Sequence, residues 1–162
     1  MLPILRWPDP RLAQPCAPVA EVTPALRHLA ADMLETMYAA PGRGLAGPQV
    51  GAMLRIFVMD VTWKEGQRDP QVILNPAIEP LGEALCRRAE GCLSIPGILT
   101  EITRPARVRM RWTDLEGVAH EAVLEDFAAA CVQHETDHLD GIVTLMRLAP
   151  EARAVAEAEY GA

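Results

Sequence analysis

Apolar residues recur at helical spacing in the first long periodic segment of the chain, residues 23–40. Thr23 is a good N-cap, and Pro24 suits the first position of a helix. The apolar positions that follow lie three or four residues apart, which predicts one buried face. These positions are Leu26, Leu29, Ala30, Met33, Leu34 and Met37. Pro41 and Gly42 are expected to end the helix.

The middle of the chain has the patterns of β-strands. Residues 53–61 and 71–78 are rich in apolar residues, and the second segment is expected to end at Pro76. Residues 108–112 alternate apolar residues with arginines, which indicates a half-buried strand. Residues 118–125 are its expected hairpin partner, reached through a short turn.

Two further helices are predicted near the end of the chain. Residues 126–141 begin with Asp126, a candidate cap, and end with Gly141, a helix stop. A shorter helix rich in Ala and Glu is expected at residues 149–160. The order of helix, strands and helix predicts an α+β fold rather than alternating βαβ units. The length of 162 residues suits one domain, residues 1–162.

Gly42, Gly44 and Gly47 spell G-x-G-x-x-G within the sequence PGRGLAGPQVG. A dinucleotide-binding loop with this pattern must follow a strand and open a helix. Here the glycines follow a predicted helix and precede a predicted strand, which argues against a cofactor loop. We interpret them as a turn, or as a loop kept bare so that another backbone can approach.

Composition sets broad limits on function. Half of the residues are apolar and 23% are charged, which is typical of a globular protein. The net charge of −7 argues against a general nucleic-acid or membrane-surface binder. No apolar run reaches the roughly 18 residues of a membrane span, and the first residues lack the layout of a signal peptide. We therefore expect a cytoplasmic location, where the four cysteines are interpreted as buried thiols, metal ligands or nucleophiles.

The strongest chemical signal is QHETDHLDG, which contains H-E-x-x-H as His134, Glu135 and His138. On a helix, positions i and i+4 share one face, so both imidazoles can bind one metal ion. Glu135 lies beside them, where it can take a proton from the attacking water. A catalytic metal site usually has three protein ligands, so a third is needed. The candidates are Cys92, Cys131, Asp137 and Asp140.

Spacing alone does not choose between the two cysteines. Cys131 lies three residues before His134 and can share its face, or it can be a small buried thiol in a pocket wall. Cys92 lies in AEGCLSIPG, whose glycines and proline predict a loop. Either cysteine with two histidines would suit Fe(II) as well as Zn(II).

Three motifs, GRGLAGPQ, EGCLSIPG and QHETDHLDG, resemble in order and spacing the signature motifs of the peptide deformylases. The similarity covers nearly the whole chain. This family removes the formyl group from the initiator formyl-methionine of new bacterial and organellar proteins. The resemblance implies antiparallel sheets packed around a central metal-binding helix. It also implies formylated nascent N-termini as substrates and a contact with the ribosome. We expect a monomer that binds no nucleic acid directly and no membrane.

The resemblance further implies roles for individual residues. The implied metal ligands are Cys92, His134 and His138, normally to Fe(II), with Zn(II) or another divalent transition metal as the alternative. Glu135 is the implied general acid and base. Gln49 and the backbone N–H of Leu93 are the implied donors to the developing oxyanion. The implied substrate-binding residues are Gly44, Arg43, Gly91 and Cys131.

The chain departs from the family pattern in the first two motifs. Arg43 stands where an aliphatic residue is usual, in the wall that receives the methionine side chain. Gly47 replaces a common alanine, which we interpret as a mild gain in backbone freedom. Arg87 and Arg88 precede AEGCLS, where apolar or acidic residues are usual. Long arginine stems can lie along an apolar wall with the charge in water, or the arginines can reshape and charge the pocket.

Two alternatives to formyl-methionine deformylation follow from these departures. One is a related hydrolase acting on another formyl- or acyl-amide, with Arg43 or Arg88 pairing to an acidic substrate group. The other is a catalytically idle paralogue that binds N-termini. The intact Glu135 argues against the second, because a pure binder has no use for a base beside its metal.

Overall fold

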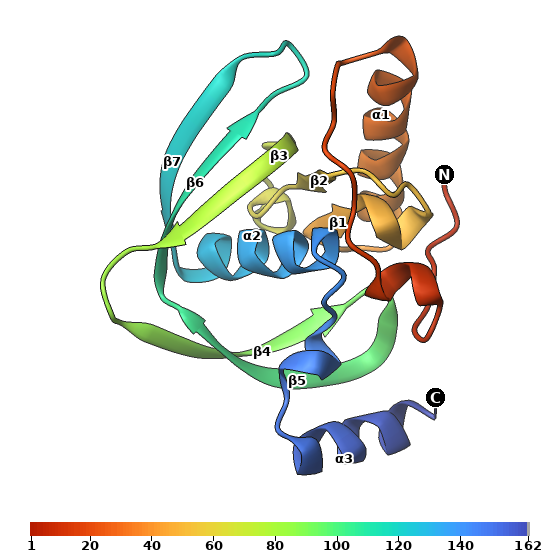
Figure 1. The fold of residues 1–162 in the computed structure, drawn as a ribbon, viewed down its shortest axis with the longest axis vertical. Coiled ribbons are helices and arrows are strands. Elements are labelled where there is room, and N and C mark those ends of the chain that lie inside the picture. The colour runs from red at the N-terminus through yellow and green to blue at the C-terminus, as the bar shows by residue number, and fades with distance from the viewer. Residues whose placement is uncertain (162) are drawn as a thin grey trace.

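Two antiparallel sheets enclose one central helix in the computed structural model, which describes residues 1–161 (Figure 1). The α-helices are α1 (Pro24–Ala39), α2 (Asp126–Leu139) and α3 (Pro150–Tyr160). The strands are β1 (Gly44–Ala46), β2 (Ile56–Met59), β3 (Gln71–Pro80), β4 (Leu85–Cys92), β5 (Ile95–Pro105), β6 (Arg107–Thr113) and β7 (Ala119–Glu125). The predicted α+β class, with antiparallel sheets around a central helix, is confirmed.

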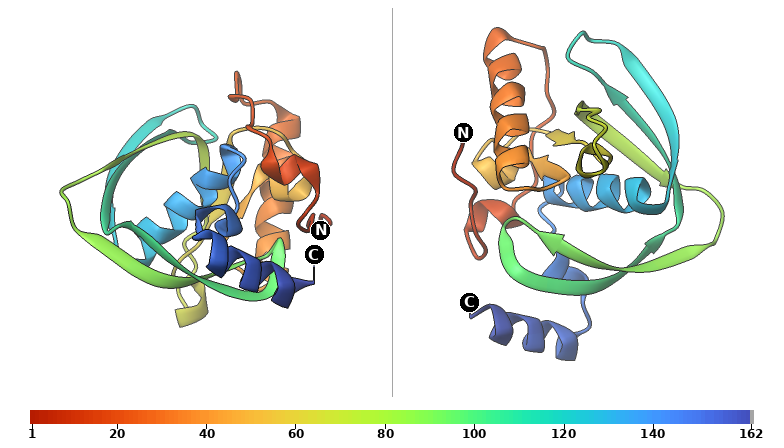
Figure 2. Two further views of the ribbon diagram at one scale, coloured as in Figure 1. Left: turned by 60° about the horizontal axis from the view of Figure 1, so that its bottom comes forward. Right: turned by 180° about the vertical axis from the view of Figure 1, so that it is seen from behind.

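The larger sheet has the strand order β1-β2-β3-β6-β7, and β4 pairs only with β5. Helix α2 lies between this sheet and the β4–β5 hairpin, while α1 and α3 lie at opposite ends of the molecule (Figures 1 and 2). The buried side of α2 packs on strands of the larger sheet. This core includes Ala129 and Val132 of α2 with Phe57, Ile73, Val108 and Met110 of the strands. The opposite side of α2 is therefore left to face β4.

Helix α1 forms as its sequence predicts. The Thr23 side chain accepts a hydrogen bond from the Leu26 N–H at 3.1 Å, and the helix ends before Pro41. Its buried apolar residues pack on β1, β2 and β3; they are Leu26, Ala30, Met33 and Met37. Leu29 and Leu34, also predicted for this face, are only partly buried. The β6–β7 hairpin and α3 are likewise confirmed.

Three local predictions are wrong. Strand β3 does not end at Pro76, because a register shift between Leu74 and Ala77 lets the strand pass the proline. Asp126 is not the cap of α2; the chain turns directly from β7 into the helix, so Asp126 is already its first residue. Cys92 is not in a loop but is the last residue of β4. The two-stranded sheet has free edges, and such edges tolerate the glycine and proline that suggested a loop.

None of the helices that the structure describes has the length and apolar character needed to cross a membrane.

Candidate metal centre and active site

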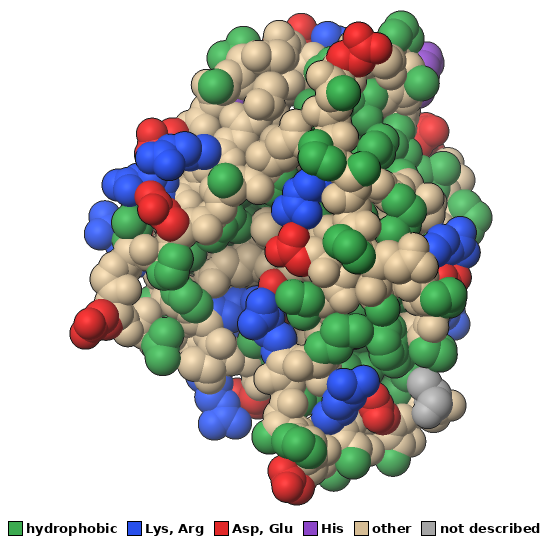
Figure 3. Space-filling model, viewed as in Figure 1, with side chains coloured by type: hydrophobic (Ala, Val, Ile, Leu, Met, Phe, Trp, Pro, Cys, Tyr) green, Lys and Arg blue, Asp and Glu red, His purple; other side chains and the backbone are tan. Residues whose placement is uncertain are grey.

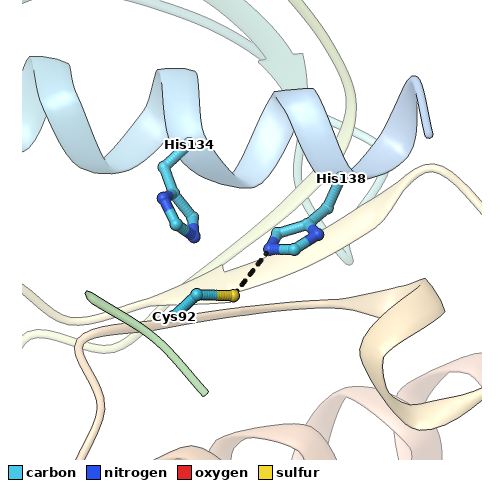
Figure 4. A group of neighbouring side chains, drawn as sticks. All are labelled: Cys92, His134 and His138. Carbon is cyan, nitrogen blue, oxygen red and sulfur yellow. Dashed lines mark hydrogen bonds between the residues drawn. The ribbon is translucent and has the colours of Figure 1, made fainter. Parts of the chain in front are cut away.

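The sulfur of Cys92 and the ring nitrogens of His134 and His138 form one cluster (Figure 4). These ligand atoms all lie within 4.8 Å of one another, and Cys92 Sγ is 3.4 Å from His138 Nε2. The imidazoles come from successive turns of α2, and the thiol comes from the end of β4 across from them. The cluster therefore joins the second and third sequence motifs.

The other candidates for the third ligand have different partners. Cys131 is buried and directs its Sγ toward the Arg43 carbonyl oxygen, at 3.8 Å. Asp137 is held by arginines, and Asp140 pairs with Arg55 at 2.9 Å. Cys131 still lines the cleft beside the cluster, as the resemblance implied.

The donor set of the cluster fits a transition metal. One thiolate and two imidazoles are ligands that Zn(II) and Fe(II) accept. His134 donates its Nδ1 hydrogen to Glu90 Oε1 at 3.0 Å, which leaves Nε2 for a metal. Burial lowers the pKa of His138 well below its ordinary value, which favours the neutral form that can act as a ligand. At His134 burial acts in the same direction, but Glu135, Cys92 and Glu90 raise the pKa well above its ordinary value. The negative charge of these neighbouring groups favours a cation at the site.

A network of ion pairs holds Glu90, the residue that accepts the hydrogen bond from His134 Nδ1. Arg104 donates from Nε and Nη2 to the two oxygens of Glu90, at 2.7 and 2.9 Å. Its Nη1 donates to Asp137 at 2.9 Å, and Asp137 also pairs with Arg147. Burial raises the pKa of Glu90, but hydrogen bonds from His134 and Arg104 outweigh it and lower this pKa to about 2. Glu90 is therefore a carboxylate that holds the His134 ring in place.

The sequence analysis missed this supporting role of Glu90 and Arg104. A signal for Glu90 is present, because alternate residues of a strand share a face and Glu90 lies two residues before Cys92. No comparable local signal connects Arg104 to Glu90, since their contact depends on the pairing of β4 with β5.

Glu135 is almost fully buried next to the cluster. Burial raises its pKa to about 7, and Glu90 and Asp137 add to the rise while His134 and Arg104 oppose it. Its Oε1 has no hydrogen-bond partner among the described residues. A carboxyl group with a pKa near neutrality can both accept and release a proton at physiological pH.

Gly44 makes room for this carboxyl group. A Cβ at Gly44 would lie 2.6 Å from Glu135 Oε2 and 2.9 Å from its Cδ, so the carboxyl group would have to move to make room for it. Gly44 thus leaves room for a side chain rather than for another backbone. The glycines follow α1, and the 3₁₀ turn Gly47–Val50 leads from them to β2 rather than to an α-helix, so the argument against a dinucleotide loop is confirmed.

Gln49 is fixed in the same region. Its Oε1 accepts a hydrogen bond from the Ala46 N–H at 2.9 Å, and its Nε2 donates to Ser94 Oγ at 3.0 Å. The same Nε2 lies 3.7 Å from Cys92 Sγ. Leu93 follows Cys92 in the turn between β4 and β5. Donors from the first and second motifs are thus placed beside the thiol.

A cleft of about 1250 Å³ opens over these groups. Every predicted site residue except His138 lines it: Arg43, Gly44, Gln49, Gly91, Cys92, Leu93, Cys131, His134 and Glu135. His138 is the deepest ligand, with only 1% of its surface exposed.

The residues that depart from the family pattern divide into two groups. Arg43 and Arg88 line the cleft, whereas Arg87 points away from it and pairs with Glu101 at 3.0 Å. The glycine that replaces a common alanine at position 47 is not a mild change in this structure. A Cβ there would lie 2.6 Å from the Ala52 carbonyl oxygen, so the glycine permits a close approach of the backbone.

Comparisons with known proteins agree with this geometry. The sequence profile of the family described as "Polypeptide deformylase" matches residues 1–154. The peptide deformylase of Acinetobacter baumannii is 47% identical over 94% of this chain and 86% of its own length. That of Alkalilimnicola ehrlichii is 51% identical over 87% of this chain and 78% of its own length.

Solved structures show the same likeness. The peptide deformylase of Synechococcus elongatus, crystallised with actinonin, superposes with a TM-score of 0.93 at 36% identity, covering 99% of this chain and 88% of that one. The Ehrlichia chaffeensis enzyme with actinonin gives 0.91 at 38% identity, covering 98% and 95%. By sequence and by fold, the chain belongs to the polypeptide deformylase family.

Proposed function

We propose that this chain is a metal-dependent hydrolase that removes the N-formyl group from N-terminal formyl-methionine of newly made proteins. Water adds its oxygen to the formyl carbon, the carbon–nitrogen bond breaks, and formate and a free amine are released. The observation that carries the proposal is the cluster of Cys92, His134 and His138 next to the buried Glu135, at the base of one cleft.

Cys92, His134 and His138 would hold the metal, which we propose is Fe(II), with Zn(II) or another divalent transition metal as the alternative. When bound, the metal supplies a nucleophile at neutral pH by lowering the pKa of water, and it polarises the formyl carbonyl. Glu90 keeps the His134 ring oriented for this task, through the 3.0 Å hydrogen bond to Nδ1.

Glu135 moves the protons of the reaction. It takes a proton from the attacking water and passes it to the nitrogen of the departing amine. Its pKa of about 7 suits both transfers, since neither its protonated nor its ionised form is strongly favoured. Gly44 leaves space for the carboxyl group at the floor of the cleft.

Gln49 and the backbone N–H of Leu93 stabilise the charge that develops on the formyl oxygen. The Gln49 amide is held in place by Ala46 and Ser94, so its N–H donors need no reorganisation during the reaction. Donors of this kind each lower the barrier by about 3 kcal/mol.

The peptide itself binds as an extended strand. Strand β1, with Gly44, is at the edge of the larger sheet, and β4, with Gly91, pairs on one side only. Both strands can therefore offer backbone hydrogen bonds to a peptide lying between them. Arg43 and Cys131 line the wall that meets the first side chain.

We propose further that residues 1–162 form one catalytic domain, which works as a cytoplasmic monomer on N-termini emerging from the ribosome. It contacts neither nucleic acid nor a membrane directly.

Formate release from formyl-Met-Ala-Ser tests the function. Anaerobically purified, Fe(II)-loaded protein is compared with its Glu135→Ala variant. We expect release by the parent and a loss of at least about 100-fold in the variant. A metal-loaded parent that releases no formate from any formyl peptide would refute the proposal.

A further inference from the structure

We propose that Leu99 selects formyl-methionyl peptides whose second residue has an apolar side chain. The inference rests on the proposed deformylase function and keeps its formyl-methionine substrate; it adds a preference at the next residue of the peptide. It is carried by the position of Leu99 on β5, opposite Gly91 of β4 and in the lining of the cleft.

Leu99 lies beside the part of β4 at which the peptide is proposed to pair. The register of the two strands places Leu99 directly opposite Gly91. Residues opposite one another in an antiparallel pair point to the same face of the sheet. Because Gly91 has no side chain, the Leu99 side chain lies over it: a Cβ built on Gly91 would be 3.4 Å from Leu99 Cδ2. The leucine therefore extends across β4 toward the free edge of that strand.

Leu99 is on the face of the hairpin that the second side chain of the peptide meets. Exposure alternates along β4, so Gly91 and Cys92 belong to opposite faces. Cys92 faces the histidines of α2, which makes the face of Gly91 and Leu99 the outer one. The first side chain of the peptide enters on the inner side, against Cys131. Successive side chains of an extended peptide alternate in direction, so the second points outward, to Leu99.

The surface of Leu99 is free to be covered by that side chain, because Leu99 is 73% exposed. Over the face shown in Figure 3, hydrophobic side chains lie among charged ones, so exposure alone does not distinguish a leucine of this protein. Leu85, for example, is 66% exposed and pairs with Pro105 at the other end of the hairpin. Leu99 differs from Leu85 in its place over Gly91, where the peptide passes.

The charged residues on the outer face of the hairpin do not favour a polar second residue. Arg87 and Glu101 pair with each other at 3.0 Å, which neutralises both charges. An apolar second side chain and Leu99 shield one another from water, which stabilises the complex. An Asn side chain has nearly the size of Leu, but its amide would lose hydrogen bonds to water on this surface.

The contact covers only part of two side chains, so its effect is moderate. We expect kcat/KM to differ by about 5- to 10-fold between peptides with Leu and Asn as the second residue. The difference should appear in KM rather than in kcat, because the contact is the same before and during the reaction.

Formate release from formyl-Met-X-Ser peptides tests the inference, with X as Leu, Ala or Asn. We expect kcat/KM for Leu to exceed that for Asn by about 5- to 10-fold, with Ala between them. In the Leu99→Ser variant the ratio of Leu to Asn should fall to about one. Leu85→Ser is the matched control, because Leu85 is the exposed leucine of the same hairpin that lies away from Gly91. It should keep the ratio of the parent.

Two isomeric peptides separate a contact at the second residue from general hydrophobicity. Leu99→Ser should lower kcat/KM for formyl-Met-Leu-Ser but not for formyl-Met-Ser-Leu, because the third side chain points back to the inner face. Calorimetric titration of the Glu135→Gln variant with the Leu and Asn peptides should show the same preference in Kd. This titration measures recognition without turnover.

The outcomes distinguish the inference from the function on which it rests. Formate release with equal kcat/KM for Leu and Asn, or a preference for Leu that survives in Leu99→Ser, would overturn the inference and leave the deformylase function intact. Absence of formate from every peptide would instead refute the proposed function.

Discussion

Replacing Arg104 by Met should destabilise the protein by about 3 kcal/mol. The Arg104 side chain is 6% exposed and that of Glu90 is 8% exposed, so their pair is shielded from water. Removing one partner of a buried ion pair costs about 3–5 kcal/mol, because the other charge is left without compensation. The lower value applies here, because in the variant Asp137 still pairs with Arg147 and Glu90 still pairs with His134. For a chain of this length, that cost lowers Tm by about 6–12 °C.

Urea denaturation of metal-free protein measures this cost without a contribution from metal binding. Arg87→Met is the control, because Arg87 lies on β4 and forms an exposed pair with Glu101; its effect should stay below about 1 kcal/mol. In the Arg104 variant, metal affinity measured by competition with a chelator should also fall by about 10- to 100-fold, because Glu90 keeps its bond to His134 but is itself no longer fixed by Arg104. An Arg104→Met protein within 1 kcal/mol of the parent would refute the reasoning from buried charge.

Three further substitutions test the cleft and the glycine loop. Gly44→Ala should lower kcat for formate release by about 100-fold with an unchanged circular dichroism spectrum, because the new Cβ displaces Glu135; an unchanged kcat would contradict this contact. Gly47→Ala should lower the free energy of unfolding by about 1–3 kcal/mol in urea titrations, because its Cβ meets the Ala52 carbonyl; an unshifted midpoint would show that the loop relaxes. Arg43→Val should raise kcat/KM for formyl-methionyl peptides several-fold, because the substitution removes one unsatisfied polar group from the wall that meets the methionine side chain. An unchanged or lower kcat/KM would contradict this expectation.

Sequence patterns predicted the elements whose signals are local. Helix α1 has its cap, its apolar face and its stop within residues 23–42, and the β6–β7 hairpin has its alternation and turn within residues 108–125. Strand β3 was cut short because Pro76 normally ends pairing, and the register shift that accommodates it is not encoded in the strand's own apolar pattern. Asn75 takes a φ of 50° there and bonds its side chain to the distant Val19 backbone.

The β4–β5 hairpin was missed for a related reason. Its strands form a separate two-stranded sheet with much of each surface exposed, so neither carries a long apolar run. Gly91 and Pro96 on either side of the turn then suggested a loop. Such a hairpin is specified by contacts with the rest of the protein, here with the N-terminal segment and with the residues that follow α2.

The same distinction between local and distant contacts governs the candidate site. His134, Glu135 and His138 lie on one helix, so their spacing alone predicted a metal site. Cys92 joins the ligands only because the end of β4 lies opposite α2, and the spacing of residues in the sequence does not predict that arrangement. Once Cys92 faces the histidines, the alternation of the strand brings Glu90 and Arg88 to the same face. The charge of Arg88, two positions before Glu90 on that face, borders the cleft, whereas the charge of Arg87 pairs with the exposed Glu101. The pair Arg87 and Arg88 thus shows why one residue of register decides between an exposed ion pair and a charge that borders the cleft.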